Sequence, residues 1–219
     1  MYRLKKDLYG LKQAPRAWYS HIDTYLIKTG FCKSNHEPTF YTKMHEGKIL
    51  ILCIYVDDLL YIGNMMLEEF KAAMQAEFEM TDLGVMKYFL GIEIQQSDKG
   101  IFVGQQKYAT DIIQKFRMTK CNLAVTPIAQ GTKLSKEDIA PSVDSTLYKR
   151  LVGSLLYLTA TRPDIMFAAS FVSRFMQSPK ISHWKVAKRI LRYIVGTPKY
   201  GFLYKHSKDN LLSGYTKKD

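Results

Sequence analysis

The stretch ILILCIYVDDLLYIG, residues 49–63, places two carboxylates between two apolar runs. The first run, residues 49–56, is rich in β-branched side chains, and the second run, residues 59–62, is followed by Gly63. An apolar strand, two acidic residues and another apolar strand form a hairpin pattern. We therefore expect Asp57 and Asp58 at the tip of a hairpin whose strands belong to a core sheet.

Adjacent carboxylates in an apolar setting are costly unless water or a cation surrounds them. Oxygen ligands suit Mg²⁺, which proteins hold by one or two carboxylates together with substrate phosphates. Side chains alternate between the faces of a strand, so Asp57 and Asp58 reach one ion only if the turn bends them. A two-metal site would need another carboxylate from a neighbouring strand. The alternative is a solvated turn, which the pattern alone favours because Asp is a common turn residue.

Composition limits the class of protein and indicates the partner. The chain has 219 residues, 47% hydrophobic and 24% charged, so a mostly disordered chain is excluded. Lys and Arg number 32 against 20 Asp and Glu, a net charge of +12. This excess indicates a polyanion, with nucleic acid the first candidate and an anionic membrane surface the second. No apolar run approaches the roughly 18 residues of a spanning helix, and we expect no membrane partner.

Cysteine and histidine usage favours a reducing compartment and gives no support to a zinc enzyme. Cys32, Cys53 and Cys121 are far apart and form no CxxC pair. The five histidines lie in no spacing typical of a zinc site or a nucleophile. The start of the chain has charge but no apolar stretch behind it, so no targeting signal is seen. We expect an intracellular location, cytoplasmic or nuclear.

The chain reads as an α+β domain followed by a mainly helical region. Periodicity predicts helices at residues 15–28, 67–78, 108–116, 145–160, 165–176 and 183–194, and strands at 39–43, 49–56, 59–62, 88–94, 101–103, 202–204 and 211–215. Residues 118–145 are polar and contain Pro127, Gly131 and Pro141, which makes them the best candidate for a linker. The predicted divisions are therefore residues 1–117, 118–145 and 146–219.

The segment LYGLKQAPRAWY, residues 8–19, is a second candidate for binding. It combines cations, a glycine and planar side chains, namely Tyr9, Gly10, Lys12, Gln13, Arg16, Trp18 and Tyr19. Such a set can hold a phosphate while a base or sugar packs beside it. The alternative is a loop leading into a helix, with Trp18 and Tyr19 in the core and the cations in water.

Two further segments carry weaker signals. Residues 88–92, Tyr-Phe-Leu-Gly-Ile, read locally as a core strand in which Gly91 marks a bulge or a close approach of the backbone. Cations recur at helical spacing in Lys185, Lys188, Arg189 and Arg192. This basic face can follow a phosphate backbone, and a solvated helix face explains it equally well.

Five sequence blocks that occur in a fixed order favour the functional interpretations of these segments over the structural alternatives. They are LKKDLYGLKQAPRAWY (4–19), ILILCIYVDDLLYIG (49–63), FEMTDLGVMKYFLGIEI (78–94), YKRLVGSLLYLTATRPDI (148–165) and AKRILRYIVGTPKYG (187–201). Together they resemble the reverse transcriptase of Ty1/copia-type LTR retrotransposons over almost the whole chain. The resemblance implies part of a right-hand polymerase fold, in which an antiparallel palm sheet with helices precedes a mainly helical thumb and connection region.

The resemblance also implies roles for the candidate residues. Asp57 and Asp58 match the catalytic carboxylates that bind Mg²⁺, with Mn²⁺ as a substitute, and Asp57 is the more direct ligand. Tyr55 and Val56 match residues at the primer end. The block with Tyr9, Gly10, Lys12, Gln13 and Arg16 matches the contact with nucleotide and template, and Phe89, Leu90 and Gly91 match the primer grip. The implied partners are an RNA or DNA template–primer, dNTPs, and the integrase and ribonuclease H of a Pol polyprotein.

Two departures from the family's pattern bear on activity. Family members carry another catalytic Asp on a palm strand upstream of the LYGLKQ block, where this chain has only residues 1–7. They also read close to GYSDAD where this chain reads Gly214-Tyr215-Thr216-Lys217-Lys218-Asp219. We therefore expect a polymerase fragment that is inactive alone, because a missing carboxylate leaves one metal under-coordinated. The alternative function is a non-catalytic retrotransposon remnant that retains only nucleic-acid binding.

Overall fold

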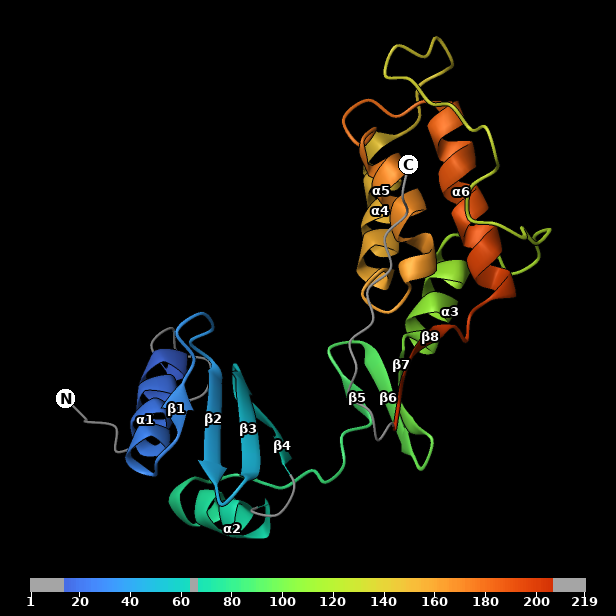
Figure 1. Cartoon of the computed structure of the whole chain (residues 1–219). Coiled ribbons are helices and arrows are strands. Elements are labelled where there is room, and N and C mark those ends of the chain that lie inside the picture. The colour runs from blue at the N-terminus through green and yellow to red at the C-terminus, as the bar shows by residue number, and fades with distance from the viewer. Residues whose placement is uncertain (1–13, 64–66, 207–219) are drawn as a thin grey trace, which may run out of the picture. The chain divides into compact units, whose positions relative to one another are not determined.

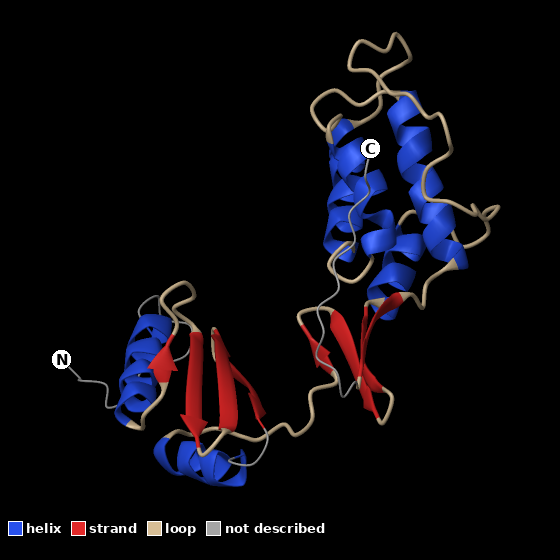
Figure 2. Cartoon of the chain, viewed as in Figure 1, coloured by secondary structure: helices blue, strands red, loops and turns tan. Residues whose placement is uncertain are grey.

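A computed structural model describes residues 14–63 and 67–206 of the chain. The chain divides into two compact units, Met1–Gly84 and Val85–Asp219. Each unit has its own antiparallel sheet (Figures 1 and 2), which has four strands, and its own apolar core. The fold is thus a mixture of helices and antiparallel sheets, as the sequence predicts. No described helix has both the length and the apolarity that crossing a bilayer requires.

The first unit contains two helices and one sheet. Its elements are α1 (Ala14–Lys28), β1 (Cys32–Lys33), β2 (Phe40–His45), β3 (Lys48–Tyr55), β4 (Asp58–Gly63) and α2 (Leu67–Glu77). The strands pair in the order β1-β2-β3-β4, so β4 lies at one edge among the described strands. The predicted hairpin is therefore confirmed as β3 and β4, paired from Leu50 opposite Gly63 to Tyr55 opposite Asp58.

Alternation along β3 determines which face of this sheet is buried. Leu50, Leu52 and Ile54 are buried, whereas the residues between them are half-buried or exposed. The buried face packs with Ile22, Leu26, Phe31, Tyr41, Phe70, Met74 and Phe78, most of which come from the two helices. A period of two on the strand and of three to four on the helices thus produces one core. The opposite face of β3 is half-buried to exposed among the described residues, with Tyr55 44% exposed, and we name it the open face.

The second unit combines a sheet with a group of helices. Its elements are β5 (Tyr88–Phe89), β6 (Ile92–Ser97), β7 (Gly100–Gly104), α3 (Gln106–Lys115), α4 (Ser145–Leu158), a 3₁₀ turn (Pro163–Ile165), α5 (Met166–Ser173), α6 (Ile181–Gly196) and β8 (Gly201–Lys205). The strand order is β5-β6-β7-β8. The last described strand therefore pairs with β7, which lies about a hundred residues earlier in the chain.

The helices of the second unit bury a large apolar cluster. It includes Ile112 of α3, Leu151 and Leu155 of α4, Val172 of α5 and Ile190 of α6. At the start of α4 the Asp144 side chain accepts a hydrogen bond of 2.8 Å from the Thr146 amide, which satisfies one of the free donors at a helix start. Helix α4 thus begins where the sequence predicts, at Ser145.

The observed division differs from the predicted boundaries. The units meet at Gly84 and Val85, and α3 packs with the later helices rather than with the first sheet. Residues 118–145 are not a free linker, because Met118 is buried and Cys121, Ile128 and Leu134 pack against the helical core. Polarity predicted a linker here because isolated apolar residues spaced far apart show no period.

The strand predicted at residues 88–94 differs from the structure, and the one predicted at residues 211–215 lies outside the described residues. The expected strand over residues 88–94 is divided by a turn into β5 and β6. Leu90 and Gly91 form this turn, both with positive φ, at 47° and 76°.

Candidate functional site

The carboxylates predicted at the hairpin tip occupy two different backbone positions. Tyr55 ends β3 and pairs with Asp58, the first residue of β4, so the two-residue turn is Val56-Asp57. Both carboxylates were predicted at the tip of the hairpin, but only Asp57 lies in the turn. Because cross-strand partners share a face, the Asp58 side chain lies with Tyr55 on the open face of the sheet.

Val56 adopts an unusual backbone conformation. Its φ is 55°, and its side chain is 59% exposed. A β-branched residue at positive φ is a true outlier, because its Cβ crowds the neighbouring backbone. Asp57 does not have positive φ, and two-residue hairpin turns with positive φ at the first central position alone normally place Gly there. Strain of this kind persists only where the surrounding pairs hold it, and it clusters at functional sites.

The two carboxylates suit a hard cation. Asp57 and Asp58 are both exposed. Asp57 is a turn residue, so strand alternation alone does not fix the direction of its side chain relative to that of Asp58. Mg²⁺ is commonly held by one or two carboxylates plus phosphate oxygens. Within residues 14–63 and 67–206 no group of three side chains that could hold a metal ion comes together.

The second candidate block is described only in part. Tyr9, Gly10, Lys12 and Gln13 lie outside the described residues. Arg16 is exposed on α1, whereas Trp18 and Tyr19 are half-buried against the core of the first unit. For these two aromatic residues the structure thus matches the alternative in which they pack in the core.

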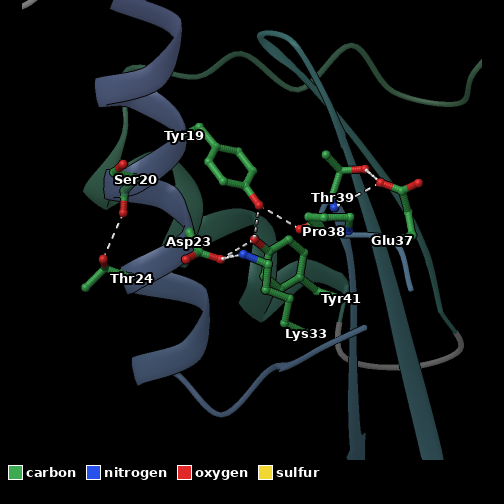
Figure 3. Close-up of polar contacts among 9 residues, drawn as sticks. All are labelled: Tyr19, Ser20, Asp23, Thr24, Lys33, Glu37, Pro38, Thr39 and Tyr41. Atoms are coloured by element: carbon green, nitrogen blue, oxygen red, sulfur yellow. Dashed lines mark hydrogen bonds and ion pairs between the residues drawn. The ribbon is translucent and has the colours of Figure 1, made fainter. Parts of the chain in front are cut away.

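Tyr19 belongs to a polar cluster between α1 and the sheet (Figure 3). Its hydroxyl donates to the Pro38 carbonyl oxygen at 2.7 Å and lies 3.3 Å from the Tyr41 hydroxyl. Asp23 accepts hydrogen bonds from Tyr41 and from the Lys33 ammonium, the latter at 2.8 Å. This cluster attaches α1 to β1 and β2, and no spacing in the sequence marked it.

The cluster shifts the ionisation of its members. Burial raises the pKa of Tyr41, and the hydrogen bond to Asp23 raises it further. Partial burial works against the charge on Asp23, but Lys33 and Tyr41 outweigh it and lower the pKa of that carboxyl. The hydrogen bond to Asp23 raises the pKa of Lys33. Lys33 and Asp23 are therefore a charged pair at neutral pH, and the cluster acts as a structural attachment.

The three residues matched to the primer grip lie at the β5–β6 hairpin. Phe89 ends β5 and pairs with Ile92, and Leu90-Gly91 is the turn between them. The prediction of a core strand was wrong for Leu90, which is 47% exposed. The predicted close approach at Gly91 is confirmed, because a Cβ there would lie 2.5 Å from the Tyr157 hydroxyl oxygen.

The four cations of the basic face share α6 but differ in accessibility. Lys185 is exposed, and the Lys188 ammonium lies 5.8 Å from the centre of the Trp184 ring. Arg189 and Arg192 are half-buried where residues 118–145 cross the helix. Arg189 donates to the Thr126 hydroxyl at 3.1 Å, and the Arg192 carbonyl accepts from the Ala124 amide at 3.4 Å. Helical spacing predicts which residues share a face but not which segment covers that face, so the partial burial of Arg189 and Arg192 was not predicted.

Comparison with known proteins identifies the family. The family profile described as "Reverse transcriptase (RNA-dependent DNA polymerase)" matches residues 1–130. The Pol polyprotein of transposon RE2 from Arabidopsis thaliana is 36% identical over 99% of this chain, which spans 15% of that relative. The Pol polyprotein of transposon TNT 1-94 from Nicotiana tabacum is also 36% identical over 99% of the chain and 17% of its own length.

A shorter relative is covered over most of its length. A Ty5-1 transposon protein of Saccharomyces cerevisiae is 32% identical over 98% of this chain and 71% of its own sequence. No solved structure matches the chain. The Asp-Asp hairpin lies inside the matched segment of residues 1–130. The chain belongs to the reverse transcriptase family and is similar over nearly its whole length to a segment of the Pol polyproteins of plant retrotransposons.

Proposed function

We propose that the β3–β4 hairpin is the nucleotidyl-transfer site of an RNA-directed DNA polymerase, working within a longer Pol polyprotein. The observation that carries this proposal is the pair of exposed carboxylates, one in a strained turn and one on the open face of the sheet. In this proposal the first unit contributes part of the palm. The helical core of the second unit contributes the thumb and connection.

Asp57 and Asp58 would hold Mg²⁺, or Mn²⁺, together with the phosphates of the incoming dNTP. The bound metal would stabilise charge on the attacking and leaving oxygens while the primer 3′ hydroxyl attacks the α-phosphate. Asp57 is the more direct ligand in this proposal, because the turn places it beyond the last pair of the hairpin. Tyr55 and Val56 would border the primer end.

The primer strand would be contacted by the exposed turn at Leu90-Gly91. The net charge of +12 supports a nucleic-acid partner, because cations that displace counterions from phosphates supply most non-specific affinity. The template–primer, dNTPs, integrase and ribonuclease H are the partners of the complete polyprotein in this proposal.

A second candidate is a retrotransposon remnant that binds nucleic acid without catalysis. It is favoured by the high positive charge together with a ligand set limited to two carboxylates among the described residues. A two-metal centre requires a further carboxylate. The two candidates differ in one observable property, which is incorporation of nucleotides into a bound primer.

Primer extension on an RNA template tests both candidates. The purified chain is supplied with a template–primer, dNTPs and Mg²⁺ or Mn²⁺, and compared with Asp57→Asn and Asp58→Asn. The control is Asp98→Asn, which alters another exposed carboxylate in a hairpin turn. Incorporation lost only in the first two variants supports polymerase activity. Salt-sensitive binding without incorporation supports the remnant, and absence of both contradicts both candidates.

A further inference from the structure

Tyr157 of α4 makes an unusual contact with the β5–β6 turn, which lies 67 residues earlier in the sequence. Its hydroxyl donates a hydrogen bond to the Leu90 carbonyl oxygen. The same hydroxyl fills the space beside Gly91 that a Cβ would need. The tyrosine hydroxyl thus bonds to the carbonyl group of Leu90 and occupies the space that Gly91, which has no side chain, leaves free.

The turn needs such support because its backbone is unfavourable. Leu90 and Gly91 both have positive φ, as in a type I′ turn, which Asn-Gly and Gly-Gly pairs normally occupy. A leucine at positive φ crowds its own carbonyl group. A Leu-Gly pair also suits a type II turn, in which only the glycine has positive φ and the central peptide is rotated. Strand β5 contributes only two cross-strand pairs, so the hairpin alone selects its turn weakly.

The orientation of the central peptide determines what the turn presents. In a trans peptide the carbonyl and amide groups point in opposite directions. Because the Leu90 carbonyl points to Tyr157, the Gly91 amide points away from it. A backbone amide at an exposed turn is a donor for a phosphate oxygen. Rotation of this peptide would exchange that donor for a carbonyl oxygen, which repels phosphate.

Tyr157 packs against Tyr108 of α3, and a separate hydrogen bond joins α3 to the hairpin. Its ring meets the Tyr108 ring edge-on, with 4.8 Å between centroids, and the Tyr108 hydroxyl lies 3.5 Å from the Ser154 carbonyl oxygen in the preceding turn of α4. Glu93 of β6 accepts a hydrogen bond of 2.6 Å from the Lys107 amide at the start of α3. Helices α3 and α4 are thereby attached to the hairpin. Tyr157 remains 43% exposed, so its hydroxyl is not needed to fill the core.

We propose that Tyr157 is a positioning residue, which holds the Leu90-Gly91 peptide in the orientation that contacts the primer strand. This inference rests on the proposed function, because it takes the 89–91 turn as a primer contact. Its specific content is that the hydroxyl of Tyr157 contributes to recognition of a primer terminus without touching nucleic acid.

Tyr157→Phe tests the inference, since it removes the hydroxyl and keeps the ring. Binding of the full chain is measured by fluorescence anisotropy with two labelled probes, a template carrying a recessed primer and the same template alone. We expect roughly fivefold weaker binding of the primed template, as for loss of one hydrogen bond, and unchanged binding of the unprimed strand. Tyr148→Phe is the matched control, because its hydroxyl also donates from α4 to a backbone carbonyl, that of Val172.

Each result decides a separate question. If Tyr148→Phe lowers the melting temperature but preserves the preference for the primed template, while Tyr157→Phe loses that preference, the positioning role is supported. If Tyr157→Phe keeps the preference shown by the wild type, the positioning role is contradicted and the proposed function stands. If the wild type has no preference for the primed template, the primer contact is contradicted, and the positioning role with it.

Discussion

Arg162 closes the end of α6 by donating a hydrogen bond of 2.8 Å from Nη1 to the carbonyl oxygen of Thr197. Its Nη2 also donates to the Thr197 hydroxyl at 2.8 Å. The rest of the guanidinium forms a two-pronged pair with Asp164, at 2.8 and 2.7 Å. The Arg162 residue is only 1% exposed. The TRPD segment, residues 161–164, therefore contains a buried cation in which all three guanidinium nitrogens donate hydrogen bonds.

Arg162→Lys should strongly destabilise the second unit. A lysine keeps the charge but cannot form the planar fork, which leaves Asp164 with the Tyr193 hydroxyl at 2.9 Å and removes the paired hydrogen bonds to Thr197 at the end of α6. Arg162 is buried but the Asp164 side chain is 29% exposed, so we expect a loss of about 2–3 kcal/mol in the free energy of unfolding, less than for a fully buried pair. Urea unfolding followed by Trp184 fluorescence in a Trp18→Phe background reports on this unit, since the chain has 2 tryptophans. Equal midpoints for Arg162→Lys and for the exposed control Arg150→Lys would contradict the prediction.

The same pair predicts acid sensitivity. Burial alone would raise the pKa of Asp164, but the Arg162 guanidinium outweighs it and holds that pKa below its usual range. A lowered pKa in the folded state means that the stabilisation is complete above the unfolded value of about 3.9 and is lost as pH falls through the folded value. We expect the urea midpoint of the second unit to fall below about pH 4. Asp164→Asn should be less stable at pH 7 and should lack this component of the acid slope, whereas Asp98→Asn should keep it.

His183 joins residues 118–145 to α6 and is fully buried. Its Nδ1 accepts from the Lys180 amide at 2.9 Å, so its Nε2 carries the proton and donates to the Ser135 carbonyl oxygen at 2.9 Å. The ring also stacks on Phe175, with 3.9 Å between centroids.

His183→Leu should remove the hydrogen-bond partner of two partly buried backbone groups, the Lys180 amide and the Ser135 carbonyl, at a cost of about 1 kcal/mol each. The segment around Ser135 should then open locally, so trypsin should cut after Lys133 and Lys136 sooner than in the wild type. The exposed His206→Leu is the control. Unchanged cleavage rates in His183→Leu would show that the segment is held by other contacts.

Residues with a regular period were predictable, and residues with long-range partners were not. The apolar alternation of 49–56 predicted β3, and the stripe over 67–78 predicted α2, because one buried face imposes a period. Arg162 and His183 are buried through partners 35 and 48 residues away, which no local pattern shows. Leu90-Gly91 read as part of a strand because a leucine rarely occupies a turn position with positive φ.

At the candidate site the sequence predicted the two carboxylates but not their backbone positions. The turn comprises Val56 and Asp57, and the strained residue is the valine. Glycine is the residue expected in such a turn. A valine in its place departs from the turn preference, and such departures are typical of functional sites.

Val56→Gly should relieve the strain in the hairpin. Glycine adopts positive φ without steric cost, although it also increases the entropy of the unfolded chain, so we expect a net gain of about 1 kcal/mol in the first unit. Trp18 fluorescence in a Trp184→Phe background follows unfolding of this unit. A matched change is Glu46→Gly, at the β2–β3 turn with φ of 50°. Since Glu46 lacks β-branching, its gain should be smaller, and a lower midpoint for Val56→Gly would contradict the strain argument.

The cations on the basic face of α6 should differ in their contributions to nucleic-acid binding and to stability. Lys185 is exposed, whereas Arg189 is half-buried and bonded to Thr126. Lys185→Gln should weaken binding of any template–primer sequence to a similar extent and reduce the slope of log affinity against log salt by about 1, as for loss of one phosphate contact. Arg189→Gln should change the slope less and lower stability instead. Salt titrations by anisotropy measure both, with Lys115→Gln at the exposed end of α3 as control. An unchanged slope in Lys185→Gln would contradict a phosphate contact at Lys185 and favour the alternative of a solvated helix face.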